Sequence, residues 1–156
     1  MINKLLLEIS KAQLLANTHA WEREKHPGKD TNTHGRIARS KKVKTRPPKA
    51  IQLDEDHQLI DYNFKANPTT ENKRQWGMIV YNPKKKDIVQ LYCTCKDFNY
   101  RLMVPFERKK LADRETTPKS IKDHAAFFPN KNWTKKTNPK GKLFICKHLA
   151  ALMSYI

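Results

Sequence analysis

The sequence predicts an α+β fold, in which a short antiparallel β-sheet is followed by a helix at the C-terminal end. Apolar residues alternate along 76–81 and again along 88–93, with a hairpin connection predicted over 82–87. Beyond these strands, Leu149, Leu152, Met153 and Ile156 follow the helical i, i+3, i+4, i+7 pattern. Only 38% of the 156 residues are apolar, so we expect one small core with part of the chain outside it.

An N-terminal amphipathic helix is predicted over residues 2–17, and residues 1–17 are assigned to it as a separate unit. Its apolar stripe consists of Ile2, Leu5, Leu6, Ile9, Ala12 and Ala16. A stripe of this width needs a partner, which is either the core of the same chain or another subunit.

Residues 18–50 are predicted to form an extended basic arm that is disordered in isolation. The stretch 36–49 contains seven basic residues and no acidic one, and Pro47 and Pro48 stiffen its exit. These seven residues are the candidate contacts to nucleic acid or to a protein partner: Arg36, Arg39, Lys41, Lys42, Lys44, Arg46 and Lys49.

The remaining residues, 51–156, are predicted to form one domain that contains an insertion over residues 96–145. A further strand is expected over 59–65, before the hairpin. Within the insertion we expect a short helix over 118–128 and a polar loop over 129–141 around Trp133. The helix that follows residue 146 closes the domain.

The three cysteines of the chain and one histidine form two closely spaced pairs. Cys93 and Cys95 end the second hairpin strand, whereas Cys146 and His148 begin the last helix. An odd number of cysteines argues against a disulfide framework and favours metal binding in a reducing compartment. Three thiolates and one imidazole suit tetrahedral zinc, and four protein ligands indicate one structural Zn²⁺ rather than a catalytic ion. Buried thiols, a redox-active pair and a Cys–His nucleophile remain as alternatives.

The CxC and CxH pairs, with Leu149 and an apolar helix behind them, resemble the SWIM zinc finger. The resemblance covers about residues 76–156 and implies a ββα framework with Cys93, Cys95, Cys146 and His148 as ligands. It also implies binding of DNA or protein and no catalysis. The 50 residues between the two pairs exceed the usual spacer of the family, which puts its binding surface in doubt.

A wider pattern is similar to small SWIM-like proteins encoded by tailed bacteriophages. It consists of the run 93–101, then Asn138, Pro139 and Gly141, and then 146–149. Some of those proteins are particle components. The resemblance therefore implies a location in the virion and in the cytoplasm of the infected cell, with bacterial cytoplasm or nucleoid as the alternative.

The net charge of +17 indicates a polyanionic partner. We expect a non-enzymatic, zinc-binding adaptor in a large nucleoprotein assembly, contacting nucleic acid, structural proteins or both, in one or several copies. No apolar run approaches the length of a membrane span, so no membrane partner is expected. No small-molecule substrate is expected for a non-enzymatic adaptor. The alternative is a free DNA-binding accessory factor or regulator of the recombination or transposition type.

Three further interpretations receive less support from the sequence. His19, His26 and His34 with His57 could form a second metal site, although solvated side chains or phosphate contacts are more common. Asp54 and Asp56 with a histidine could serve a nuclease, but no matching second carboxylate cluster follows. Two aromatic residues set among basic ones could stack on bases, namely Tyr100 and Trp133.

Overall fold

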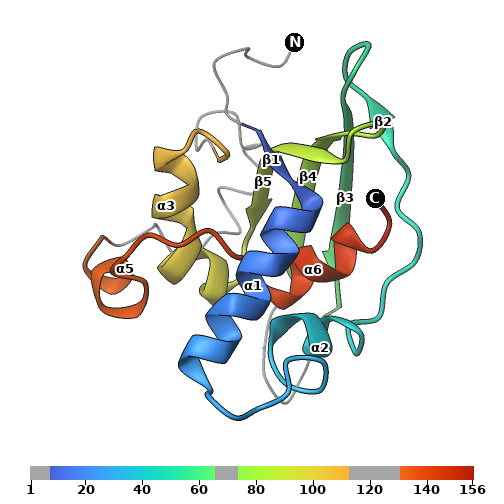
Figure 1. Cartoon of the computed structure of the whole chain (residues 1–156). Helices are drawn as coiled ribbons and strands as arrows, with labels where there is room; N and C mark the ends of the chain where they lie inside the picture. Colours follow the sequence, from blue (N-terminus) through green and yellow to red (C-terminus); the bar gives the residue numbers. More distant parts are fainter. Residues whose placement is uncertain (1–7, 66–73, 113–130) are drawn as a thin grey trace.

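A five-stranded antiparallel sheet with strand order β1-β5-β4-β3-β2 forms the framework of the fold (Figure 1). The computed structural model describes residues 8–65, 74–112 and 131–156, without the side chains of residues 131–133. The strands are β1 (Ile9–Ser10), β2 (Ile51–Gln52), β3 (Gln58–Phe64), β4 (Gln75–Asn82) and β5 (Asp87–Cys93). The α+β class is confirmed.

The central hairpin of β4 and β5 follows the sequence prediction closely. Asn82 begins the turn, and its side-chain oxygen accepts hydrogen bonds from the backbone N–H groups of Lys84 (3.0 Å) and Lys85 (3.1 Å). Lys86 takes a left-handed conformation with φ of 58° and donates its N–H to the Asn82 carbonyl at 2.8 Å. The strands therefore run antiparallel up to Cys93, which pairs with Gly77.

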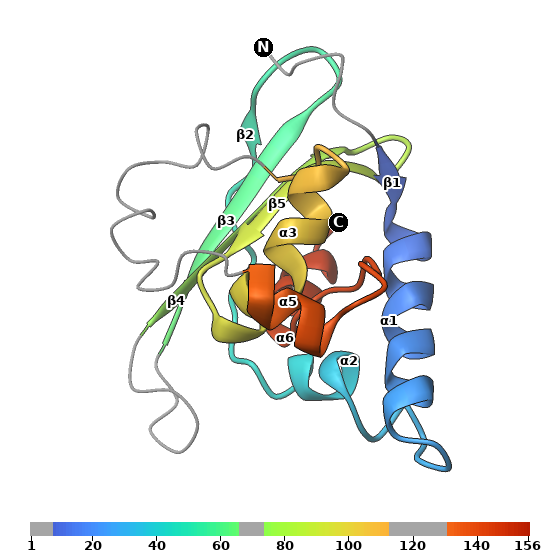
Figure 2. The ribbon, with the colours of Figure 1, turned by 90° about the vertical axis from the view of Figure 1, so that its left-hand side faces the viewer.

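Helices pack beside this sheet. Figure 2 shows α6 between the sheet and α1, with α2 near the lower end of α1. The helices of the described chain are α1 (Lys11–Lys25), α2 (Arg36–Ser40), the π-helix η1 (Phe98–Leu102), α3 (Met103–Arg108), α5 (Lys131–Thr137) and α6 (Lys147–Met153).

The prediction of a helix over residues 2–17 is wrong in its bounds. Residues 1–7 lie outside the described residues, Ile9 and Ser10 form β1, and the helix runs from Lys11 to Lys25. Ser10 caps the helix by accepting a hydrogen bond from the Gln13 N–H at 3.0 Å. The buried face of α1 carries Leu14, Thr18 and Trp21, whereas Ala12 and Ala16 of the predicted stripe are exposed.

Residues 18–50 do not form one extended arm. Residues 18–25 continue α1, so the predicted unit boundary after residue 17 falls inside a helix, and residues 36–40 form α2. Residues 41–43 form the turn that ends α2, and the segment 44–50 then runs along the surface to β2 (Figure 1). Segment 41–50 is anchored by Val43, which packs against the core, and by a 2.6 Å hydrogen bond between Thr45 and Tyr155. These partners are distant in sequence, which is why composition alone indicated disorder.

The described parts of the 96–145 insertion contribute several residues to the core. Phe98 and Phe106 are fully buried and stack with ring centroids 5.8 Å apart. The predicted loop over 129–141 is wrong over residues 131–137, which form α5; Thr134 of this helix donates its hydroxyl hydrogen to the Tyr100 carbonyl at 2.9 Å. The helix predicted over 118–128 lies outside the described residues.

The C-terminal helix is confirmed as α6, and it packs directly against β4. Leu149 and Leu152 are fully buried. A Cβ placed on Gly77 would lie 3.5 Å from a methyl carbon of each, an ordinary van der Waals contact, so both leucines pack directly over this strand position. Among the described helices, none combines the length and apolar character needed to cross a membrane.

Candidate metal centre

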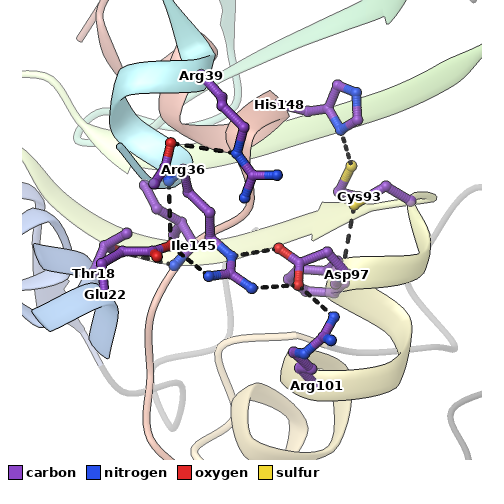
Figure 3. Close-up of polar contacts among 12 residues, drawn as sticks. Thr18, Glu22, Arg36, Arg39, Cys93, Asp97, Arg101, Ile145 and His148 are labelled. Atoms are coloured by element: carbon purple, nitrogen blue, oxygen red, sulfur yellow. Dashed lines mark hydrogen bonds and ion pairs between the residues drawn. The ribbon is translucent and has the colours of Figure 1, made fainter. Parts of the chain in front are cut away.

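The fold brings the two predicted ligand pairs into one cluster. The ligand atoms of Cys93, Cys95, Cys146 and His148 all lie within 4.8 Å of one another, and all four residues are buried. Figure 3 shows the imidazole of His148 pointing at Cys93, with its Nδ1 atom 3.8 Å from the Cys93 Sγ atom. Three thiols and one imidazole therefore converge from β5, the turn after it and the first turn of α6.

The turn that carries Cys95 is held by Asn99, a fully buried side chain of η1. The Asn99 amide donates to the carbonyl oxygens of Cys93 at 3.1 Å and Cys95 at 2.9 Å. The backbone N–H of Phe98 also points at the Cys95 Sγ atom, at 3.4 Å. These bonds hold the backbone at both cysteines of the first ligand pair, which is the arrangement expected of supporting residues around a metal.

The second ligand pair is positioned by α6 and by the segment that leads into it. Cys146 stands at the N-cap position of α6, and its carbonyl accepts from the Ala150 N–H at 3.0 Å. The neighbouring Ile145 N–H donates to the buried hydroxyl of Thr18 on α1 at 3.1 Å. The ring of Phe64 lies against the His148 ring with centroids 4.8 Å apart and limits how the imidazole can turn.

The buried environment acts strongly on the three thiols. Burial raises the pKa of Cys93 to about 11 and raises the pKa of Cys95 further above its ordinary value. Burial also opposes ionisation of Cys146, but hydrogen bonds from the Cys93 and Cys95 thiols and from His148 outweigh it and lower the Cys146 pKa. Three thiolates in so buried a cluster therefore require a cation to compensate their charge.

A zinc ion fits this donor set. Bonds of about 2.3 Å to sulfur and 2.0–2.1 Å to nitrogen in a tetrahedron separate sulfur from nitrogen by about 3.6 Å. The observed separation between Cys93 Sγ and His148 Nδ1 is 3.8 Å. The cluster fits one structural zinc ion, which would neutralise the thiolates and join the hairpin to α6.

An ion-pair network connects this centre to the first two helices. Arg36 of α2 binds Asp97 through Nε at 2.5 Å and Nη2 at 2.7 Å, and it binds Glu22 of α1 through Nη1 at 2.5 Å. Asp97, two residues after Cys95, also accepts from Arg101 at 2.9 Å (Figure 3). Because the Asp97 and Glu22 contacts outweigh burial, the pKa of Arg36 is raised above its ordinary value.

The prediction that Arg36 contacts a partner is therefore wrong, because this side chain is buried and paired with Glu22 and Asp97. Its residue exposure is only 8%, and its guanidinium also lies 4.8 Å over the ring of Phe144, which stacks on Trp21. A basic residue in a basic run carries no sequence signal that separates it from its exposed neighbours. The signal missed was the pair of acids at Glu22 and Asp97, which only the fold brings together.

The other candidate contacts are accessible. All six side chains are exposed, and no ion pair joins them to an acidic group in the described part of the chain. They are Arg39, Lys41, Lys42, Lys44, Arg46 and Lys49.

The three remaining interpretations of the sequence have different outcomes. Within residues 8–65, 74–112 and 131–156, no second cluster of potential metal ligands occurs, so the four histidines do not form a site. The Asp54 carboxylate instead binds His57 Nδ1 at 2.9 Å and accepts from the Asp56 N–H in the turn between β2 and β3. The side chain of Trp133 lies outside the described residues.

A β-hairpin and a helix joined by CxC and CxH ligands define a small zinc-finger module of the ββα type. The model of the SWIM zinc finger family matches residues 75–104 and 140–156, which cover β4, β5, the Cys95 turn and α6. The resemblance read from the ligand pairs is thus confirmed. Comparisons with curated proteins and with solved structures give no match to this chain.

Proposed function

We propose that this chain is a non-enzymatic adaptor in which the zinc module is structural and a basic surface binds the phosphate backbone of nucleic acid. The basic surface consists of Lys41, Lys42, Lys44, Arg46 and Lys49 on segment 41–50, which follows α2. The observation that carries the proposal is that these side chains are exposed on a backbone held in place by Val43 and Thr45. Binding would therefore not require ordering a free chain, which lowers its entropic cost.

Other features of the chain support the same assignment. The four metal ligands leave no open position for a substrate at a tetrahedral ion. The sequence left open a nuclease that uses Asp54. In the structure the Asp54 carboxylate closes a turn by binding two backbone N–H groups and His57. The whole chain carries a net charge of +17, which favours association with a polyanion.

A pair of charge-matched variants tests the basic surface. One variant changes Lys41, Lys42, Lys44, Arg46 and Lys49 to glutamine. The control changes five exposed residues elsewhere in the described chain, and each variant has a net charge of +12, that is +17 − 5. The control residues are Lys84, Lys85, Arg108, Lys109 and Lys135.

Fluorescence anisotropy with a labelled duplex at several salt concentrations is the measurement. We expect the first variant to bind more weakly and the slope of log K against log salt to fall by about 0.9 for each lost phosphate contact. The control should retain most of the slope. Equal losses in both variants would mean that total charge and not this surface drives binding. Absence of duplex binding by the native chain would assign the surface to an acidic protein partner.

We also propose a tailed-bacteriophage particle as the setting, on the strength of the wider sequence pattern around the ligands. Mass spectrometry of purified particles should then detect the chain at a constant copy number. Detection only in the cytoplasm or nucleoid of the host would favour the alternative, a free DNA-binding accessory factor.

A further inference from the structure

A hollow of about 180 Å³ lies at the elbow between α1 and α2, outside the residues matched by the zinc-finger model. We call it the elbow pocket. Its lining combines the end of α1, the loop after it and the short helix α2. The lining residues are Glu22, His26, Lys29, His34, Gly35 and Arg39.

The elbow pocket is cationic although it contains one carboxylate. Glu22 is buried, and its Oε1 atom accepts hydrogen bonds from Arg36 Nη1 at 2.5 Å and from the Arg36 N–H at 3.2 Å. This charge is therefore balanced from inside the fold. Lys29 and Arg39 line the pocket with exposed side chains, and no ion pair joins either to an acid in the described residues.

The remaining polar groups around the pocket agree with an anionic ligand. His26 and His34 are exposed and each can donate a ring N–H to an anion. The nearby carboxylate of Asp30 accepts the Asn32 N–H at 2.9 Å within its own turn. The pocket thus presents up to four donor side chains, with its one acidic lining residue already paired.

The shape of the elbow depends on Gly35. Its φ is 105°, a region that side chains rarely adopt, and a Cβ there would lie only 2.8 Å from the Glu22 Cγ atom. Its carbonyl accepts from the Arg39 N–H at 2.9 Å and from Arg39 Nε at 3.3 Å. The glycine and the Glu22–Arg36 pair therefore hold α1 and α2 in the arrangement that forms the pocket.

We propose that the elbow pocket binds a phosphate group. Lys29 supplies a compact positive charge, Arg39 supplies a planar set of donors, and the two imidazoles add ring donors. Arg39 stands two residues before Lys41, so the pocket continues into the basic surface of segment 41–50. The assignment to a backbone phosphate of nucleic acid rests on the proposed function, whereas phosphate binding itself does not.

Amide and imidazole NMR shifts of the zinc-loaded full chain, titrated with inorganic phosphate against chloride at equal ionic strength, test the pocket. We expect saturable shifts at His26, His34 and Gly35. The double variant Lys29→Gln with Arg39→Gln should bind phosphate about tenfold more weakly, because two charged donors are lost. A control with the same loss of charge, Lys84→Gln with Arg108→Gln, should bind as the native chain does.

The outcomes separate this proposal from the proposed function. No saturable shift with phosphate, or equal weakening in both double variants, would overturn the pocket even if the basic surface still binds a duplex. Saturable shifts that a short oligonucleotide displaces would support a backbone phosphate as the ligand. Saturable shifts that no oligonucleotide displaces would overturn that source and assign the pocket to free phosphate.

Discussion

Arg36 and Arg39 lie three residues apart on the short helix α2 and have different roles. The Arg36 guanidinium is buried between two carboxylates, whereas Arg39 is exposed at the rim of the elbow pocket. Their side chains have the same intrinsic chemistry, so the difference arises from which groups the fold places beside each. The direction in which each arginine points from the helix therefore decides whether it stabilises the fold or remains available to a ligand.

Replacement of Arg36 by methionine should destabilise the zinc-loaded protein by about 3 kcal/mol, since removing one member of a buried ion pair leaves uncompensated charge. Glu22 and Asp97 would then lose their common partner. Urea unfolding followed by tryptophan fluorescence measures the change in the free energy of unfolding. The matched variant Arg39→Met, at an exposed position, should change it by less than about 0.5 kcal/mol. Similar losses in the two variants would contradict a structural role specific to Arg36.

Besides the ion pair of Glu22, a buried hydroxyl joins helix α1 to the segment that carries Cys146. Thr18 accepts the Ile145 N–H at 3.1 Å, directly before the ligand Cys146, and donates its own hydrogen to the Leu14 carbonyl at 2.8 Å. Trp21 stacks on Phe144 one turn further along the helix, with ring centroids 4.1 Å apart. The contact between α1 and the segment that leads into α6 is therefore both apolar and hydrogen-bonded.

The variant Thr18→Val keeps the shape of this side chain and removes its acceptor. We expect a loss of about 1–3 kcal/mol in unfolding free energy, because the buried Ile145 N–H would lose its partner. Thr18→Ser is the control, since it retains the hydroxyl and removes one methyl group. Thermal unfolding of both zinc-loaded variants gives the comparison, and a serine variant less stable than the valine variant would argue that packing, not the hydrogen bond, matters here.

Across the whole molecule, the zinc centre and the basic surface are linked through a short series of contacts. Asp97 lies two residues after Cys95 and binds Arg36, and α2 leads directly into segment 41–50. At the other end of the segment, Tyr155 after α6 holds Thr45. Loss of the metal should therefore loosen the segment as well as the ligands.

Purified protein should contain about one zinc ion per chain, and its removal by a chelator should unfold the module, as for other structural zinc sites. Hydrogen exchange followed by mass spectrometry should then show faster exchange in residues 93–99 and 147–153 and also in α2. Cys146→Ser should reproduce this pattern without chelator. Metal-free protein with unchanged exchange and melting would contradict a structural zinc.

The contacts that join the basic surface to the rest of the fold limit which variants can test it. Deleting residues 18–50 would remove half of α1 together with Arg36, so a loss of nucleic-acid binding in that variant would not distinguish contact from misfolding. Substitutions confined to exposed side chains avoid this problem. They leave Val43 and Thr45 in place to hold the segment.

The sequence by itself determined the features that depend on short spacing. The ligand pairs, the hairpin from β4 to β5 and the apolar face of α6 each follow from residues a few positions apart, so their periodicity and turn chemistry are visible without a structure. The zinc-finger resemblance rests on the same residues.

The tertiary structure alone decided the features that depend on partners far apart in the chain. Arg36 meets Asp97 across 61 residues, and Thr18 meets Ile145 across 127, so no local pattern could predict that residues 18–40 pack rather than extend. The physical reason is that a buried polar side chain must be hydrogen-bonded, and the partners of Arg36 and Thr18 include groups from distant parts of the chain. These long-range contacts decide which basic residues stay exposed to a polyanion. They also decide where the elbow pocket forms.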